Sequence, residues 1–280
     1  MMEAVEKVGM SPAALLDKVS RWKGGDASRL VADGAAFGEG ERQKVDVWAP
    51  VGDPPPGGWP VLVFFYGGGW VSGARQEYGF VGRAFAAQGF LTMLPDYGLH
   101  PHSTYPDYLH DGAAATRWAF DHAGDFGGDP QRIAVMGHSA GAYNAAMIML
   151  DPRYLYAVGL PLATIKAAAL LSGPYDFPYL IERGGLLAFE KAPVQESQPV
   201  AYARRDAPPT LLITGTADTT VRARNSQSLA KALTAAGARV ELKLYRGQGH
   251  TDPLRALSPL FRSANPALAD CADFLHGHLG

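Results

Sequence analysis

A serine, an aspartate and a histidine of this sequence are spaced so that they could perform nucleophilic catalysis. Ser139 lies in the run GHSAG, between Gly137 and Gly141 and directly after the apolar run Arg132–Met136. Small residues at both flanks suit the tight strand-to-helix turn that presents a serine nucleophile. A serine that begins a helix can also be an N-cap, so the pentapeptide alone does not decide between the two roles. A nucleophilic serine needs a contacting base and an acid that orients the base.

The acid and the base each follow a later apolar run. Asp218 comes after Thr210–Thr214 in a loop of small residues, and His250 comes after Val240–Tyr245. Functional groups of parallel sheets gather at the carboxyl ends of the strands, so we expect both side chains to approach Ser139. Serine, aspartate and histidine follow one another in the chain order of the α/β-hydrolases.

Three other residues compete for these roles. Asp176, in SGPYDF, is the rival acid, but Asp218 follows the strand after which the acid is expected. Asp252 is too close along the chain to the histidine. His138 directly precedes the serine, so its side chain is expected to point away from it. The remaining histidines lie in polar loops or helices, where solvated histidine is common.

A glycine run after another strand could supply hydrogen-bond donors to a developing oxyanion. Tyr66-Gly-Gly-Gly-Trp70 follows the apolar run 60–66, and glycines let the main chain approach a ligand without interference from Cβ atoms. The helix expected after Ser139 adds the amide of Ala140 at its positive end. The run lacks the lysine of a phosphate-binding loop and the glycine spacing of a dinucleotide site.

Composition limits the kinds of partner. The 280 residues are 47% apolar and 19% charged, with a formal net charge of -2, so nothing favours nucleic acid or an anionic membrane surface. We therefore expect a small-molecule partner. No clustered histidine or cysteine spacing predicts a metal, and we expect no cofactor. The one cysteine, Cys271, excludes an internal disulfide and is expected to be buried. The first residues lack an apolar signal-peptide core and no span is expected, which favours a cytoplasmic location.

Strand and helix patterns alternate, which predicts an α/β fold with a mostly parallel sheet and helices on both sides. Apolar runs predict strands at 60–66, 90–94, 132–136, 167–171, 210–214 and 240–245. Helical patterns cover 78–88, 105–122, 139–150 and 223–236, the last ended by Gly237. Lys44–Trp48 alternates apolar and polar residues like a half-buried edge strand. We expect one domain over residues 1–280, with 1–40 and 178–201 forming a small cap.

The sequence resembles the esterase and lipase branch of the α/β-hydrolases that carries an HGGGW-type oxyanion loop, with hormone-sensitive-lipase-like and arylformamidase-like relatives. The matching stretches include QKVDVWAP, FFYGGGW, PDYGLHPHSTYP, GGDPQRIAVMGHSAGA, SGPYD, TLLITGTADTTV and RGQGH. The resemblance implies an α/β-hydrolase fold, with a central sheet of about eight strands, helices on both faces and a short cap. The roles that it implies are Ser139 as nucleophile, His250 as base, Asp218 as orienting acid, and the amides of Gly68, Gly69 and Ala140 as oxyanion donors.

The sequence departs from this family at the loop. Tyr66 replaces the usual histidine, and Gly98 replaces the arginine expected in PDY-x-L. The family's histidine helps to hold the loop by hydrogen bonding, and a tyrosine hydroxyl could do so from a different place. Substrate-binding candidates are Tyr66, Trp70 and Tyr143, and Phe177, Tyr179 and Leu180 are further candidates for the pocket wall. Ordinary core packing is the alternative for each wall residue.

The main hypothesis is a serine carboxylesterase that hydrolyses short-chain or aryl esters through an acyl-enzyme. An arylformamidase-like amidase is the enzymatic alternative, because related short-capped sequences share the loop. A catalytically inactive binding protein of the same fold is the alternative from another class. The sequence leaves a homodimer open.

Overall fold

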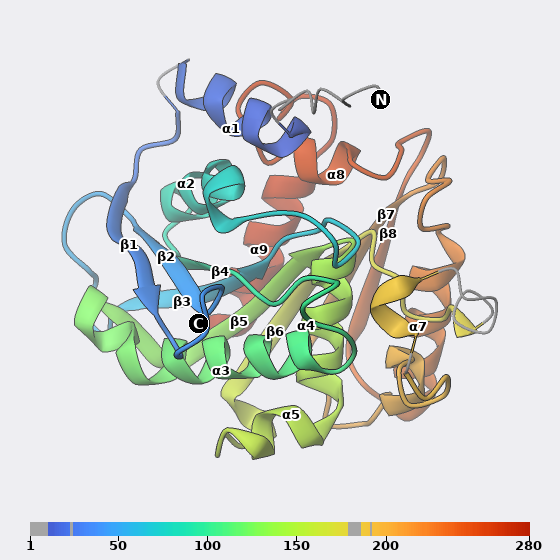
Figure 1. Ribbon diagram of the computed structural model, residues 1–280. Coiled ribbons are helices and arrows are strands. Elements are labelled where there is room, and N and C mark those ends of the chain that lie inside the picture. The colour runs from blue at the N-terminus through green and yellow to red at the C-terminus, as the bar shows by residue number, and fades with distance from the viewer. Residues whose placement is uncertain (1–10, 23–24, 179–185, 191) are drawn as a thin grey trace, which may run out of the picture.

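Eight strands form one sheet in the part of the chain that the structure describes, in the order β1-β2-β4-β3-β5-β6-β7-β8 (Figure 1). The computed structural model describes residues 11–22, 25–178, 186–190 and 192–280. The run from β4 to β8 is parallel, and β2 is antiparallel to both of its neighbours. The strands are β1 (Arg29–Ala36), β2 (Lys44–Ala49), β3 (Trp59–Phe65), β4 (Leu91–Pro95), β5 (Gly128–His138), β6 (Ile165–Leu171), β7 (Thr210–Gly215) and β8 (Val240–Tyr245). The α/β fold with a mostly parallel sheet is thereby confirmed.

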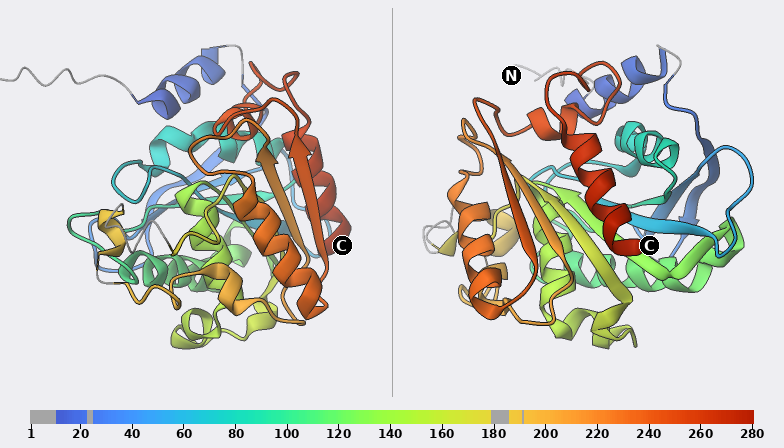
Figure 2. Two further views of the ribbon diagram at one scale, coloured as in Figure 1. Left: turned by 90° about the vertical axis from the view of Figure 1, so that its right-hand side faces the viewer. Right: turned by 180° about the vertical axis from the view of Figure 1, so that it is seen from behind.

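Helices cover both faces of the sheet. Helices α2 and α9 pack on one face, where Figure 2 (right) shows α9 crossing the back of the sheet, and α3, α4 and α7 pack on the other. The α-helices are α1 (Pro12–Trp22), α2 (Gly79–Ala87), α3 (Asp107–His122), α4 (Ala140–Leu150), α5 (Pro152–Ala157), α7 (Arg224–Ala236), α8 (Asp252–Arg255) and α9 (Ala267–Leu279). Short 3₁₀ turns are η1 (Arg75–Tyr78), η2 (Ala123–Phe126), η3 (Leu162–Thr164), η4 (Leu187–Phe189) and η5 (Pro199–Tyr202).

Strand β3 shows why the central strands are continuously apolar. All of its residues are buried. Successive side chains of a strand point to opposite faces. Leu62 and Phe64 accordingly pack into the core beneath α2 and α9, whereas Val61, Val63 and Phe65 pack into the core beneath α3 and α4. A parallel strand between two helical layers therefore has no face left for polar residues.

The N-terminal part of the sheet differs from the sequence prediction. The prediction of an edge strand at Lys44–Trp48 is wrong, because β1 pairs with β2 and covers it, and β1 itself had no counterpart in the apolar pattern. Asp46 gives β2 its alternating appearance. Its carboxylate is not solvated but accepts hydrogen bonds from the Gly34 amide at 2.8 Å and from Arg75 Nε at 2.6 Å. Burial raises the pKa of Asp46 above its usual value.

Part of the expected N-terminal cap belongs to the sheet, since β1 lies within residues 1–40. Helix α1 packs outside the sheet and is joined to α2 by a buried ion pair between Asp17 and Arg83, at 2.8 Å. The hydroxyls of Ser20 and Ser258 share a hydrogen bond of 2.7 Å between α1 and the segment after α8. Helix α1 thus links α2 to the segment that follows α8.

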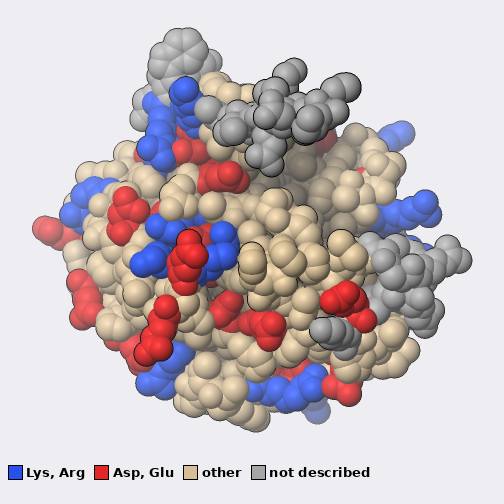
Figure 3. All heavy atoms as spheres, viewed as in Figure 1, with Lys and Arg blue, Asp and Glu red and all other residues tan. Residues whose placement is uncertain are grey.

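Cys271 is buried in α9, as expected, and Gly237 ends α7 with a φ of 82°. Acidic and basic side chains are interspersed over the described part of the face in Figure 3. Within the described ranges, the structure contains no helix with the length and apolarity that crossing a membrane requires.

Candidate active site

Ser139 occupies a sharp turn between β5 and α4. Its φ of 54° and ψ of −121° are unusual for a residue with a side chain. A Cβ on Gly137 would lie 2.3 Å from the Gly141 carbonyl oxygen, and a Cβ on Gly141 would lie 2.0 Å from the Phe65 carbonyl oxygen. Both flanking glycines are therefore required by backbone contacts. The turn leaves the Ser139 amide bonded to the Leu171 carbonyl at 2.9 Å, so β6 also fixes its position.

Asp218 and His250 come from the loops after β7 and β8, which lie against each other. The amide of Ala217 donates to the Gln248 carbonyl at 2.9 Å, and a Cβ on Gly215 would lie 2.0 Å from the same oxygen. Asp218 Oδ1 accepts from the amides of Thr220 and Val221, at 2.9 and 2.8 Å. The carboxylate is thereby held by its own loop, and Oδ2 is left for the histidine.

The three side chains form a continuous hydrogen-bonded chain. His250 Nδ1 lies 2.8 Å from Asp218 Oδ2, and His250 Nε2 lies 2.8 Å from Ser139 Oγ. A carboxylate only accepts, so Nδ1 carries the proton and Nε2 accepts from the serine hydroxyl. Asp218 is buried, and the histidine side chain is 15% exposed. This arrangement can remove a proton from Ser139 and hold it on an imidazole that remains open to a ligand.

The structure also locates the competing residues. The amide of Asp176 donates to Asn225 Oδ1 at 3.0 Å. The carboxylate that pairs with His250 is that of Asp218, not that of Asp176. Asp252 Oδ2 accepts from the Gly249 amide at 2.7 Å and so shapes the histidine loop. His138 is bonded to the main chain of His250.

The glycine loop begins beside the serine. A Cβ on Gly67 would lie 3.1 Å from Ser139 Cβ, and Gly68 and Gly69 follow with φ values of 131° and 60°. Among the described residues no acceptor is bonded to the amides of Gly68 or Gly69. The amide of Ala140 is the first of α4, where helical N–H groups have no partner within the helix. Three donors therefore lie in the two segments that adjoin the serine.

Tyr66 lies beneath this loop. Its side chain is fully buried, stacked on Tyr78 and Tyr97 with ring centroids 5.1 and 4.7 Å apart. Its hydroxyl donates to Asp96 Oδ1 at 2.7 Å and accepts from Arg42 Nη2 at 2.6 Å. Burial raises the pKa of Tyr66 well above its usual value, so the phenol stays protonated. The structure thus places Tyr66 where it supports the loop and does not expose it to a substrate.

Two arginines complete the support. Arg42, from the turn between β1 and β2, also donates to the carbonyls of Gly73 and Tyr97, both at 2.8 Å. Arg75 Nη1 pairs with Asp96 Oδ2 at 2.8 Å. A buried carboxylate is stable when cations and N–H groups satisfy it. We call Arg42, Tyr66, Arg75 and Asp96 the loop-support network.

Trp70 and Tyr143 belong to a cluster of rings on the other side of the loop. Trp70 Nε1 donates to Asn144 Oδ1 at 2.9 Å, and the Tyr143 hydroxyl donates to the Ser197 carbonyl at 2.9 Å. Phe189 contacts both rings, with centroids 4.8 and 5.3 Å away. Trp70 is 3% exposed and Tyr143 is fully buried, so both pack as core residues. Phe177 joins the cluster, whereas Tyr179 and Leu180 lie outside the described residues.

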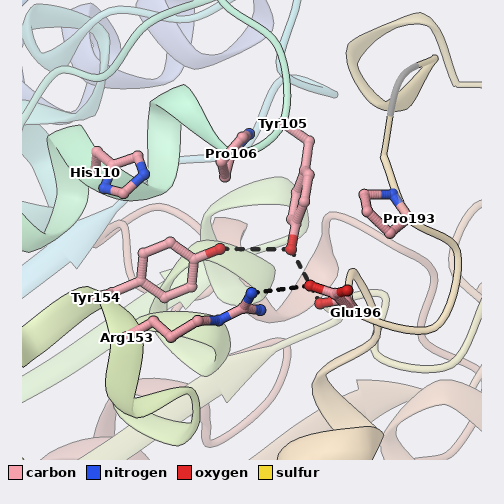
Figure 4. Close-up of a pocket in the computed structure, with 7 residues that line it drawn as sticks. All are labelled: Tyr105, Pro106, His110, Arg153, Tyr154, Pro193 and Glu196. Carbon is pink, nitrogen blue, oxygen red and sulfur yellow. Dashed lines mark hydrogen bonds and ion pairs between the residues drawn. The ribbon is translucent and has the colours of Figure 1, made fainter.

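A separate cavity of about 260 Å³ lies between α3, α5 and the segment before η5 (Figure 4). Its lining residues are Tyr105, Pro106, His110, Arg153, Tyr154, Pro193 and Glu196. Arg153 is paired with Glu196 at 2.9 Å and with Asp151 at 2.8 Å, and the Tyr105 hydroxyl donates to the Glu196 carbonyl. These polar groups largely satisfy one another. In the described part of the chain, no three carboxylate, histidine or cysteine side chains are grouped as a metal would require.

Sequence reasoning missed several contributors to the site, Arg75 among them. Asp96 lies in the stretch PDYGLH and His138 in GHSAG, but no sequence pattern indicates a role for either residue. Arg42 precedes the first recognised strand, and its contacts depend on the unrecognised β1. Phe189 lies in the insert 178–201, for which the sequence predicts only a small cap, and a single aromatic residue there carries no periodic signal.

Comparisons with known proteins agree with this fold. A family model described as the alpha/beta hydrolase fold matches residues 62–252. A probable isoprenylcysteine alpha-carbonyl methylesterase from Oryza sativa subsp. japonica is 31% identical over 80% of this chain and 59% of its own length. Esterase LipC from Mycobacterium tuberculosis is 33% identical over 71% of this chain and 54% of its own length. This chain therefore spans little more than half the length of these relatives.

A solved structure is similar over almost its whole length. The propionate-bound Est2 esterase of Thermogutta terrifontis superposes with a TM-score of 0.74 and 26% sequence identity, covering 88% of this chain and 94% of that one. The family match includes the serine turn, the aspartate loop and the histidine loop. The chain belongs to the alpha/beta hydrolase fold family.

Proposed function

We propose that the protein is a serine carboxylesterase that acts on short-chain or aryl esters through an acyl-enzyme. The observation that carries the proposal is the hydrogen-bonded chain Ser139, His250 and Asp218, with 2.8 Å at both links. An inactive binding protein would have no need to keep this chain aligned in a strained turn. The esterase names of the relatives and of the Thermogutta structure support an ester as the substrate.

Each group has a defined role in the proposed reaction. Ser139 Oγ attacks the ester carbonyl carbon while its proton moves to His250 Nε2. Asp218 keeps the proton on Nδ1 before the attack and stabilises the imidazolium after it. The amides of Gly68, Gly69 and Ala140 donate to the tetrahedral oxyanion, where one such donor is worth about 2.7–4 kcal/mol.

The remaining steps return the enzyme to its starting state. When the intermediate collapses, the bond to the alcohol oxygen breaks and His250 gives its proton to the departing alcohol. A water molecule then attacks the acyl-enzyme, with His250 taking one of its protons. The acid departs and Ser139 recovers its proton. No step needs a metal or a redox group, because the base, the acid and the donors all come from the chain.

The aromatic cluster supports a small acyl group. Trp70 directly follows the glycine loop, and Tyr143 lies one helical turn after Ser139, with its amide bonded to the serine carbonyl at 3.1 Å. Phe189 fills the space between the two rings. Bulky buried rings so close in the chain to the reacting groups leave little volume for a long acyl chain on this side.

The first experiment compares wild type with Ser139→Ala. We expect wild type to hydrolyse p-nitrophenyl acetate faster than butyrate and much faster than octanoate, and to gain one adduct from a fluorophosphonate by intact mass. Ser139→Ala should do neither, with a loss in kcat of about 10⁴-fold or more. A folded wild type that is both inert and unlabelled would overturn the proposal. Turnover of N-formylkynurenine in preference to phenyl esters would instead favour the arylformamidase-like activity.

Three further predictions accompany this function. One is that residues 1–280 form a single domain, which limited proteolysis can test. Another is a cytoplasmic location, which cell fractionation can test. The last is a homodimer, which sedimentation equilibrium can test. A small-molecule ester is the proposed partner.

A further inference from the structure

His138 lies between the three parts of the proposed catalytic site. It ends β5 directly before Ser139 and is 4% exposed. Its Nε2 is 3.0 Å from the His250 carbonyl oxygen, and the two imidazole rings are 5.0 Å apart with a tilt of 46°. A Cβ on Gly67 would lie 3.0 Å from its Nδ1. One ring therefore touches the base and the start of the glycine loop, next to the nucleophile.

The hydrogen bond fixes the tautomer of this ring. A carbonyl oxygen only accepts, so Nε2 of His138 carries the hydrogen. Nδ1 is buried and has no hydrogen-bond partner within the described residues. A second proton, placed on Nδ1, would therefore have no acceptor among the described residues. Burial and the neighbouring His250 lower the pKa of His138 to about 3, so the His138 ring is neutral near pH 7.

We propose that His138 is a positioning residue, whose Nε2–H holds the main chain of His250 so that the imidazole of His250 stays on Ser139. The proposal rests on the proposed serine esterase function. His138 itself exchanges no proton and touches no reacting atom. It links the loop of His250 to β5, the strand that leads into the nucleophile.

The geometry gives this tie a clear purpose. Asp218 holds the far side of the His250 ring, and the Gly249 amide is bonded to Asp252. Neither contact joins the loop of His250 to β5, the strand that precedes Ser139. The bond from His138 does, across 112 positions of the chain. A displacement of about 1 Å in a reacting group can cost on the order of 10²-fold in rate. One hydrogen bond at this place therefore has leverage on kcat.

A neutral ring is essential to the role. The titratable groups that act on His138 are His250 and Asp218. During the reaction His250 becomes an imidazolium, and a second cation at this separation would oppose that charge. A buried neutral histidine supplies a rigid donor without this penalty.

The test uses two variants of similar size. His138→Gln can place an amide N–H near the position of Nε2, whereas His138→Leu keeps bulk and removes the donor. We expect His138→Leu to lose about 10–100-fold in kcat with little change in KM. His138→Gln should recover to within about fivefold of wild type. Rates are normalised to active sites titrated with fluorophosphonate.

His276→Leu is the matched control, because His276 also bonds a carbonyl through Nε2, at 2.8 Å from the Gln88 oxygen, but on α9. It should retain wild-type kcat and KM. A folded His138→Leu with full activity per titrated site would overturn the proposal, and so would a His138→Gln as slow as the leucine variant. Wild type that is neither active nor labelled would overturn the esterase function itself, so the two failures are distinguishable.

A measurement on wild type keeps the proposal testable even where the variants fold poorly. The ¹⁵N shifts of His138 should show the neutral, Nε2-protonated tautomer from about pH 5 to about pH 9. A His138 that carries its proton on Nδ1, or that titrates within this range, would contradict the proposed hydrogen bond.

Discussion

The hydrogen-bonded relay and the loop-support network lie on two sides of the same glycine loop, yet they are built differently. Ser139, Asp218 and His250 each follow a parallel strand, so the register of the sheet brings them together. In the network, Arg42 comes from the turn between two antiparallel strands and reaches Tyr66 and Asp96 below the loop. In the relay, three side chains are hydrogen-bonded one after another. In the network, several side chains donate hydrogen bonds to one buried carboxylate, that of Asp96.

This difference predicts how each region responds to a change. A relay that moves one proton has no redundancy, because every link must be in place. Asp96 accepts from Tyr66, Arg42 and Arg75, so the loss of one partner leaves others. Substitutions in the relay should therefore act on rate far more strongly than substitutions in the network.

The largest effect is expected from Asp218→Asn. The amide keeps an acceptor for the amides of Thr220 and Val221, but it no longer stabilises the correct tautomer of His250 or its positive charge. We expect kcat with p-nitrophenyl acetate to fall about 10⁴-fold, with the melting temperature within a few degrees of wild type. Asp176→Asn is the control and should stay near the wild-type rate. A loss of less than tenfold in Asp218→Asn would show that another group orients the base.

The next effect concerns the turn itself. Gly141→Ala would place a Cβ 2.0 Å from the Phe65 carbonyl oxygen, and main chain on both sides cannot yield. We expect the free energy of unfolding to fall by about 3 kcal/mol or more in urea titrations, with activity lost in parallel. Gly277→Ala in α9 meets no atom within 4 Å and should instead gain up to about 1 kcal/mol. Equal stabilities of the two variants would contradict the tight turn.

The sequence predicts best those features that depend on residues close together in the chain. GHSAG, the strand before it and the helix after it are contiguous, so the turn and its glycines could be anticipated. Asp218 and His250 could be anticipated because buried parallel strands are continuously apolar and mark where their loops begin.

The parts that could not be predicted depend on pairing between distant polar residues. Asp46 has the pattern of a solvent-facing residue because its partner, Arg75, lies far along the chain. Residues 29–36 are mixed in character, since β1 is an edge strand with partly exposed residues on both faces. Tyr66 resembled a substrate contact because it adjoins the glycines, although the strand turns its side chain beneath the loop. Pattern gives the position of a residue along an element, but not the partner of a buried polar group.

The smallest effect, and the sharpest comparison of the two regions, is expected from Tyr66→Phe. The ring keeps its stacking on Tyr78 and Tyr97, and only the hydroxyl between Asp96 and Arg42 is removed. Removing this donor from the buried Asp96 carboxylate should lower the free energy of unfolding by about 1–3 kcal/mol. The loop above should lose part of its alignment, so we expect kcat to fall about tenfold, equivalent to about 1.4 kcal/mol, with KM little changed.

Tyr245→Phe provides the matched control, because it removes a similar hydrogen bond, 2.6 Å from Tyr245 to Asp270, away from the glycine loop. It should lower the melting temperature without lowering kcat per titrated site. If Tyr66→Phe also left kcat unchanged, the loop would be held by its own backbone turns, in which Val71 and Ser72 donate to the Gly68 carbonyl, and the network would serve stability alone. If it instead lost as much as Asp218→Asn, the contrast between a serial relay and a redundant support would fail, because the tyrosine hydroxyl would then be as indispensable as the carboxylate.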